Sequence, residues 1–271
     1  MSFQQNINMN KVILITGASS GIGKASFDFL NAQGHIVYGT SRKQTDSDYI
    51  LQMDVTDKVS IKQTINQIYS NHGKIEVLIN NAGMSLVGAI EDTADSEARN
   101  IMETNFWGVV NVTQSVLPIM RKQGSGQIIN ISSLAGLFSI PFQGYYSAAK
   151  FGLEGWTEAL RMEVSPFNIQ VSLIEPGDFE TEIFQNRIVI EKAEGSPYAA
   201  WFENALDIIV KGERQGDNPI KIAKLVERII NLKRPKVRYT VGKPLDVLAS
   251  KLKKVLPQKL FEKLIKDHYQ L

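Results

Sequence analysis

The chain has 271 residues, of which 43% are hydrophobic and 21% are charged. This is the composition of an ordinary globular protein with enough apolar side chains to form a core. The sequence contains no cysteine, which excludes disulfides, thiolate catalysis and cysteine-bound metal centres. The three histidines are widely separated along the chain, and we therefore expect no metal site.

The two ends of the chain differ in character. The first ten residues are polar and do not resemble a signal peptide, and no apolar run approaches the roughly 20 residues of a membrane span. We therefore expect a cytoplasmic protein. The net charge is only +2, but residues 219–271 hold fourteen basic and four acidic side chains. Such a tail is typical of a solvated surface, and it also suits a membrane surface or an anionic partner.

Short β-branched runs alternate with helical patterns along most of the chain. Most of the runs are apolar at nearly every position, as in strands that are buried on both faces. This alternation predicts an α/β fold with a Rossmann-like doubly wound parallel sheet of about seven strands. The predicted strands span 11–16, 35–40, 49–55, 75–80, 127–132, 169–174 and, more weakly, 237–241. The predicted helices span 21–32, 57–71, 96–121, 146–164 and 219–231.

A glycine-rich turn, Thr16-Gly-Ala-Ser-Ser-Gly-Ile-Gly23, connects the first predicted strand to the first predicted helix. Its glycines allow the backbone to approach a pyrophosphate, and the helix N-terminus offers free N–H groups. The turn therefore predicts a dinucleotide site, although an ordinary glycine-rich connection has the same local pattern. The residues expected to line this site are Gly17, Ser19, Ser20, Gly21, Ile22 and Gly23.

The end of the second predicted strand indicates which cofactor is bound. An NAD site places an acidic residue there, to accept a hydrogen bond from the ribose 2′-hydroxyl. This chain has Arg42 and Lys43 instead, and Arg42 can bind a phosphate with paired donors. We infer NADP(H) rather than NAD(H), the alternative being a solvated pair of basic residues. Asp54, followed by Val55, either accepts from the adenine amino group or serves as a turn residue.

Tyr146 and Lys150 lie one helical turn apart in a predicted helix. A free phenol has a pKa of about 10, and a nearby ammonium lowers it toward neutral pH. A surface contact between the two side chains is the simpler interpretation. Ser133 stands at the end of a predicted strand, where parallel sheets bind ligands. Asn105 lies in the middle of a predicted helix, a position that asparagine disfavours without a local reason.

Taken in chain order, these elements resemble the short-chain dehydrogenase/reductase family over roughly residues 10–181. The segments Asn80-Asn-Ala-Gly83 and Pro176-Gly177, and then Thr181, complete the pattern. With Arg42 after the second strand, the sequence is similar to NADP-preferring members such as 17β-hydroxysteroid and retinol dehydrogenases.

The resemblance implies an oxidoreductase that transfers a hydride between NADP(H) and a carbonyl or secondary alcohol. It implies Tyr146 as general acid/base, Lys150 lowering the pKa of Tyr146 and binding the nicotinamide ribose, and Ser133 polarising the carbonyl. Asn105 would hold a water that relays protons from Lys150. The implied cofactor contacts are those of the glycine-rich turn together with Arg42, Asp54, Val55, Asn80, Ala82, Gly83, Tyr146, Lys150, Pro176, Gly177 and Thr181.

We expect one dinucleotide-binding catalytic domain over residues 1–271. Within it, residues 178–218 lose the strand–helix alternation and are interpreted as a substrate lid. The aromatic and apolar residues in the lid and before Tyr146 predict a bulky hydrophobic substrate, although they also suit simple packing of the lid. These residues are Leu137, Phe138, Phe142, Phe179, Ile183, Phe184, Tyr198, Trp201 and Phe202.

The C-terminal extension, 245–271, combines apolar residues with lysines. It favours a helical lid that packs over the substrate pocket or a neighbouring subunit, and it leaves a membrane-surface helix as a less favoured alternative. The family resemblance implies a homodimer or homotetramer through the helices at 96–121 and 146–164.

Two other functions are compatible with parts of the sequence. A non-catalytic NADPH-binding regulator would keep the glycine-rich turn and Arg42, but it would not need Ser133, Tyr146 and Lys150 together. Sugar-nucleotide dehydratases and epimerases usually carry a differently spaced glycine turn and an acidic residue after the second strand, and this sequence has neither. Nucleic-acid binding is disfavoured, because the basic residues are not interleaved with a stacking platform.

Overall fold

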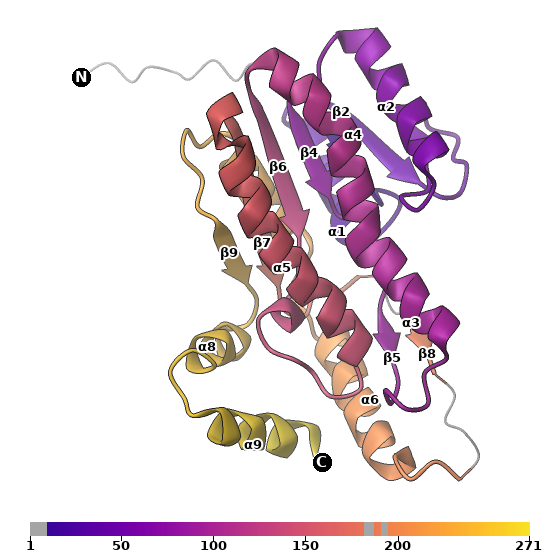
Figure 1. The fold of residues 1–271 in the computed structure, drawn as a ribbon, viewed down its shortest axis with the longest axis vertical. Helices are drawn as coiled ribbons and strands as arrows, with labels where there is room; N and C mark the ends of the chain where they lie inside the picture. Colours follow the sequence, from indigo (N-terminus) through magenta and orange to yellow (C-terminus); the bar gives the residue numbers. More distant parts are fainter. Residues whose placement is uncertain (1–9, 182–186, 191–194) are drawn as a thin grey trace.

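The computed structural model describes residues 10–181, 187–190 and 195–271. It contains a seven-stranded parallel sheet in the order β3-β2-β1-β4-β6-β7-β9 (Figure 1). The strands are β1 (Val12–Ile15), β2 (Ile36–Ser41), β3 (Ile50–Gln52), β4 (Val77–Asn80), β6 (Gly126–Ile131), β7 (Ile169–Pro176) and β9 (Arg238–Val241). The expected parallel, Rossmann-like α/β fold is therefore confirmed.

Helices cover both faces of this sheet. On one face lie α2 (Lys58–His72), α4 (Gly108–Gln123) and α5 (Gly144–Val164), whose buried side chains include Ile65, Val116 and Leu160. On the other face lie α1 (Gly21–Ala32) and α7 (Ile220–Ile230), which pack through Leu30 and Val226. Because both faces are covered, the central strands consist almost entirely of buried apolar residues, as their sequences indicate.

The long helix predicted at 96–121 is interrupted. It consists of α3 (Asp95–Met102), a π-helical turn at Glu103–Trp107 and α4. Such turns in an α-helix are rare and occur frequently at functional sites. Here the turn contains Asn105, the residue whose place in a helix lacked a reason in the sequence.

Outside the main sheet, a small second sheet and a helix within residues 178–218 were not expected from the sequence, whereas the helical character of the C-terminal extension was. A two-stranded parallel sheet joins β5 (Leu86–Val87) to β8 (Ile188–Val189), and the segment interpreted as a lid holds the helix α6 (Ala199–Arg214). The C-terminal extension forms α8 (Pro244–Leu252) and α9 (Gln258–Tyr269), and Pro257 precedes the second helix. Figure 1 shows both C-terminal helices beyond the end of β9, on the same side as α6.

The strand order reverses between β1 and β4, since β2 and β3 lie to one side and β6, β7 and β9 to the other. In open parallel sheets, ligands bind at the carboxyl ends of the strands near such a reversal. The glycine-rich turn follows β1 at this edge, and Ser133 follows β6 at the same edge.

Candidate active site

A cavity of about 1600 Å³ lies at the carboxyl edge of the sheet. It extends from the glycine-rich turn, past Tyr146, to the C-terminal helices. Most of the residues predicted from the sequence line it, namely Gly17, Ser19, Ser20, Gly21, Ile22, Arg42, Asp54, Val55, Ala82, Gly83, Asn105, Ser133, Tyr146, Lys150, Pro176, Gly177 and Thr181. Residues far apart in the sequence therefore meet in one cavity.

The glycine-rich turn packs directly against the segment that follows β4. Gly17 has φ of +68°, and a Cβ atom on it would lie 2.8 Å from the Cα of Ala82, so only glycine fits. The amide of Asn81 donates to the backbone oxygens of Thr16 and Gly17 at 3.0 and 2.9 Å, and thereby holds the turn in shape. Asn81 also lines the cavity. Asn81 was not among the predicted site residues, and its only signal in the sequence is its place between Asn80 and Ala82.

Two predicted cofactor residues do not line the cavity. The side chain of Asn80 points into the core, where its amide donates to Thr113 Oγ1 at 2.9 Å and to Asn130 Oδ1 at 2.8 Å. A Cβ atom on Gly23 would lie 2.1 Å from the backbone oxygen of Gly17, so this glycine permits α1 to approach the turn. Both residues therefore support the site from the protein interior. Asn80 does so through its hydrogen bonds in the core, and Gly23 through its close contact with the turn.

Arg42 and Lys43 follow β2 and are exposed at the cavity edge. The backbone oxygen of Arg42 accepts a hydrogen bond from the Gln52 amide at 3.2 Å, which fixes the start of this loop. Asp54 lines the cavity as well, but its Oδ1 accepts from the backbone N–H and the hydroxyl of Thr56, both at 2.8 Å. Asp54 therefore serves as a turn residue, which is one of the two roles that the sequence left open for it.

Tyr146 is partly exposed toward the cavity and is hydrogen-bonded to Ser133. Burial raises the pKa of Tyr146 above its ordinary value, and the hydrogen bond with Ser133 offsets only part of this rise. The direction is opposite to the expectation that Lys150 would lower this pKa. The physical reason is that desolvation of the phenolate is the largest effect in this structure.

Lys150 is buried, and its ammonium donates to the backbone oxygen of Ile131 at 2.9 Å. Its Nζ lies 5.8 Å from the centroid of the Tyr146 ring. Burial lowers the pKa of Lys150 to about 8, against the opposing effect of the negative charge of Glu154. The amine is therefore fixed between the phenol and the end of β6, and it titrates close to neutral pH.

Asn105 is fully buried in the π-helical turn. Its Oδ1 accepts from the Met84 N–H at 2.9 Å, and its Nδ2 donates to the Met84 oxygen at 2.8 Å. Both polar groups of the side chain are thus used to hold the segment that follows β4. The implied relay of protons through a water remains a prediction, and the side chain has a clear structural partner in Met84.

The two C-terminal helices line part of the cavity with apolar side chains, beside the polar side chains of Asp246 and His268. Phe261 of α9 packs edge-on against Phe138 at 5.7 Å and also contacts the cluster around Leu134. The C-terminal extension therefore packs over the cavity, as the sequence predicted. The apolar lining from this region comprises Leu134, Phe138, Phe179, Leu245, Leu248, Ala249, Leu252, Phe261, Leu264 and Ile265.

Only some of the predicted aromatic residues reach the cavity. Phe138 and Phe179 line it, whereas Phe202 stacks edge-on with Phe142 in a separate cluster. Trp201 is 51% exposed, and Tyr198 donates from its hydroxyl to Glu91 at 2.7 Å. Leu137 packs with the Phe261 cluster, and Ile183 and Phe184 lie outside the described residues. The sequence pointed to an apolar pocket but assigned much of its lining to the wrong segment.

None of the helices in the described part of the chain is long and apolar enough to cross a membrane.

Comparison with known proteins gives a consistent result. The family model of short chain dehydrogenases matches residues 11–189. A 3-ketodihydrosphingosine reductase from Bacteroides thetaiotaomicron is 46% identical over 265 residues, which cover 96% of this chain and 98% of that protein. Retinol dehydrogenase 8 from Bos taurus is 30% identical over 254 residues, covering 84% of this chain and 80% of its own length.

A solved structure of a short-chain dehydrogenase from Streptomyces avermitilis superposes with a TM-score of 0.82 at 33% identity. The match covers 96% of this chain and 99% of that one. The family acts on carbonyl and alcohol carbons with a nicotinamide cofactor. The chain belongs to the short-chain dehydrogenase/reductase family of oxidoreductases.

Proposed function

We propose that this enzyme uses NADPH to reduce a long-chain hydrophobic ketone to a secondary alcohol, with Tyr146 as the proton donor. The observation that carries this proposal is the position of Tyr146 in the cavity. The glycine-rich turn lies toward one end, and the apolar side chains of α8 and α9 lie toward the other. A cofactor bound at the turn and an apolar substrate bound under the helices would meet at this phenol.

The residues present fit a bound dinucleotide phosphate. Only glycine fits at Gly17, and the N-terminus of α1 directly follows the turn, which is the arrangement that accepts a pyrophosphate. Thr181 packs over Gly21, where a Cβ atom would lie 3.1 Å from the Cβ of Thr181. At the other side, the exposed guanidinium of Arg42 is placed to pair with a ribose 2′-phosphate. The two residues that directly follow β2 are Arg42 and Lys43, so no carboxylate stands at this position to oppose that phosphate.

The raised pKa of Tyr146 favours catalysis in the direction of reduction. A phenol that keeps its proton at neutral pH can give that proton to the carbonyl oxygen while a hydride adds to the carbonyl carbon. The bound cofactor supplies the hydride. Ser133, hydrogen-bonded to Tyr146, would orient the same oxygen, and the Lys150 ammonium would stabilise the phenolate left behind. The product is then a secondary alcohol, and Tyr146 recovers its proton from solvent.

The substrate class follows from the apolar end of the cavity. Leu248, Leu252 and Ile265 offer a lining for a hydrocarbon chain, and such surfaces bind apolar groups without directional contacts. The 46% identical relative from Bacteroides thetaiotaomicron is named for reduction of a long-chain ketone, 3-ketodihydrosphingosine. We extend that substrate class to this chain because the identity spans nearly the full length of both proteins.

Other expectations remain predictions. These are the single catalytic domain over residues 1–271, a cytoplasmic location and a homodimer or homotetramer. Exposed apolar side chains on the two long helices support the last of them, with Trp107 at 47%, Phe151 at 42% and Met162 at 70% exposure. The basic tail leaves membrane contact as the less favoured alternative.

The test is a substrate panel followed by the absorbance of the reduced nicotinamide. The purified full chain is incubated with NADPH or NADH and with 3-ketodihydrosphingosine, retinal, a steroid ketone or a short polar ketone. We expect turnover with NADPH and the long-chain ketone to exceed all other combinations. Reduction of only the short polar ketone would refute the substrate class, and faster turnover with NADH would refute the cofactor preference.

A further inference from the structure

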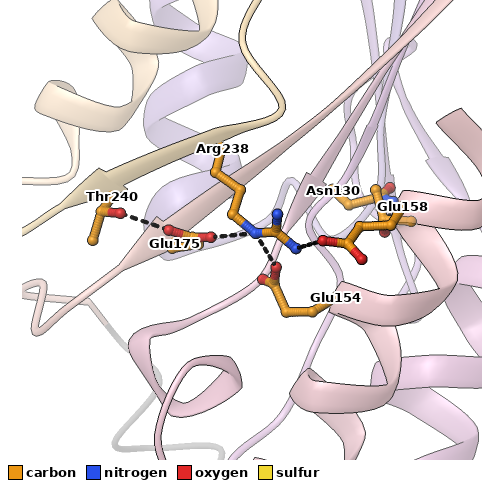
Figure 2. A network of polar contacts seen from close by, with 7 residues as sticks. Asn130, Glu154, Glu158, Glu175, Arg238 and Thr240 are labelled. Carbon is orange, nitrogen blue, oxygen red and sulfur yellow. Dashed lines mark hydrogen bonds and ion pairs between the residues drawn. The ribbon is translucent and has the colours of Figure 1, made fainter. Parts of the chain in front are cut away.

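An ionic cluster connects α5 to β7 and β9 (Figure 2). At its centre is Arg238 of β9, whose Nε lies 2.9 Å from Oε2 of Glu154 and 3.2 Å from Oε1 of Glu175. Its Nη2 donates to Glu158 at 2.6 Å. Glu175 also accepts a hydrogen bond from Thr240 at 2.6 Å. One guanidinium thus connects the catalytic helix to the strand that carries the Pro176-Gly177 segment.

The two inner carboxylates are deeply buried. The side chains of Glu175 and Glu154 are 1% and 7% exposed, whereas that of Glu158 is 52% exposed. Burial raises the pKa of both inner carboxyls, and the guanidinium of Arg238 partly offsets the rise. Buried ion pairs contribute little net stability, because desolvation of the charges cancels much of their attraction. The cluster therefore calls for a role other than stabilising the fold.

Glu154 is in contact with the parts of the site that carry the acid/base chemistry. It lies one helical turn after Lys150, so the two side chains share a face of α5. It also lies beside Ser132, the residue before Ser133. A Cβ atom on Gly136 would lie 2.9 Å from the Ser132 hydroxyl oxygen and 3.2 Å from Cγ of Glu154. This close packing holds the carboxylate in one place.

Several charged groups surround this pair. Tyr146 faces Lys150 from the cavity side, and Asp178, in the segment that follows β7, acts on Tyr146. Arg238 and Glu158 adjoin Glu154 from β9 and from the next turn of α5, and Lys254 acts on Glu175. Of the carboxylates in the described part of the chain, Glu154 is the one whose charge raises the pKa of Lys150.

We propose that Glu154 is a positioning residue that keeps the Lys150 amine in its ammonium form, and that Arg238 holds Glu154 in place for this purpose. The proposal rests on the proposed role of Lys150 beside Tyr146. An ammonium at this position is needed throughout the reduction, since it stabilises the phenolate after proton transfer. Without the carboxylate, burial alone would favour the neutral amine.

The experiment measures the titration of Lys150 directly, without cofactor or turnover. The full chain is exposed to a trace of acetic anhydride at a series of pH values, and peptide mass spectrometry gives the acetylated fraction at Lys150. We expect a midpoint of about 8 in the unaltered chain. In Glu154→Gln, which keeps the shape of the side chain, we expect the midpoint to fall by about one pH unit.

Glu158→Gln is the matched comparison, because it removes the charge from the exposed partner of the same guanidinium and leaves Glu154 intact. Its Lys150 midpoint should stay within experimental error of the unaltered chain. An unchanged midpoint in Glu154→Gln would overturn the proposal, and so would equal shifts in the two variants. If Glu154→Gln fails to fold, Glu154→Asp keeps the charge and must retain the midpoint of the unaltered chain. Because the labelling needs no substrate, failure of the ketone assay would leave this result standing.

Discussion

The ammonium of Lys150 donates to the backbone oxygen of Ile131 at 2.9 Å, and this hydrogen bond joins α5 to the end of β6. Ser133 follows two residues after Ile131, so the same strand end that fixes the amine also carries the hydroxyl bonded to Tyr146. The Lys150 amine and the Ser133 hydroxyl are therefore held by α5 and by the end of β6 together, and neither element could position both of them alone.

Replacing Tyr146 with phenylalanine removes the proton donor and little else. Loss of a general acid costs about 10²- to 10⁴-fold in rate, so we expect kcat for ketone reduction to fall within that range. Binding of NADPH, measured by fluorescence titration, should remain within about threefold. The neighbouring Tyr145→Phe is the matched control and should retain activity. Comparable losses in both variants would contradict the assignment of Tyr146.

Arg42 should determine the preference between the two nicotinamide cofactors. A hydrogen bond to a charged group contributes about 1.5–3 kcal/mol, so Arg42→Ala should weaken NADPH binding by about 10- to 100-fold. NADH lacks the 2′-phosphate, and its Kd should change by less than about threefold. Isothermal titration of both cofactors checks this expectation, with Lys43→Ala measured in parallel to separate the two cations. An equal effect on NADH would show that Arg42 does not contact that phosphate.

The pH dependence of kcat/KM for NADPH should follow the titration of the buried Lys150 amine. The pKa of Lys150 is lowered to about 8, so the ammonium is present below that pH and is lost above it. We expect kcat/KM for NADPH to fall as the pH rises through about 8. In Lys150→Arg the side chain stays charged at every accessible pH, and this descending limb should disappear. A limb that persists unchanged in the variant would assign the titration to another group.

Phe261 should contribute both to the stability of the fold and to the binding of long-chain substrates. It is 5% exposed and packs on Phe138, so Phe261→Ala should cost about 3 kcal/mol or somewhat more of unfolding free energy. We also expect KM for the long-chain ketone to rise more than KM for a short ketone. Leu260→Ala on the same helix is the control, because Leu260 is 47% exposed and does not line the cavity. Equal changes in KM for both ketones would remove α9 from the substrate site.

The sheet and the cofactor turn were predictable from the sequence because their signals are local. Strands buried on both faces must be apolar throughout, and Gly17 and Gly21 take positive φ values at a turn that separates a strand from a helix. The segments near 11–16 and 21–32 therefore fall within a residue or so of β1 and α1. The proximity of Tyr146 and Lys150 could be predicted for the same reason, since one helical turn fixes their relative position.

The features that the sequence could not reveal depend on contacts between distant segments. The pairing of β5 with β8 has only two residues in each strand, which is too short for a recognisable pattern. Asn80 and Asn81 are neighbours of the same type, yet the first points into the core and the second holds the glycine-rich turn. No local rule separates them, because the alternation of side chains at a strand end depends on register.

The amino-acid sequence alone determined the α/β class, through the alternation of strand and helix patterns, and it placed Tyr146 and Lys150 on one helical face, through their spacing of four residues. Only the tertiary structure decided the direction of the Tyr146 pKa, because burial by surrounding elements raises it by more than Ser133 lowers it. It also decided that Arg238, far along the chain, reaches Glu154. The energy of a buried charge depends on everything that surrounds it, and that environment exists only in the folded chain.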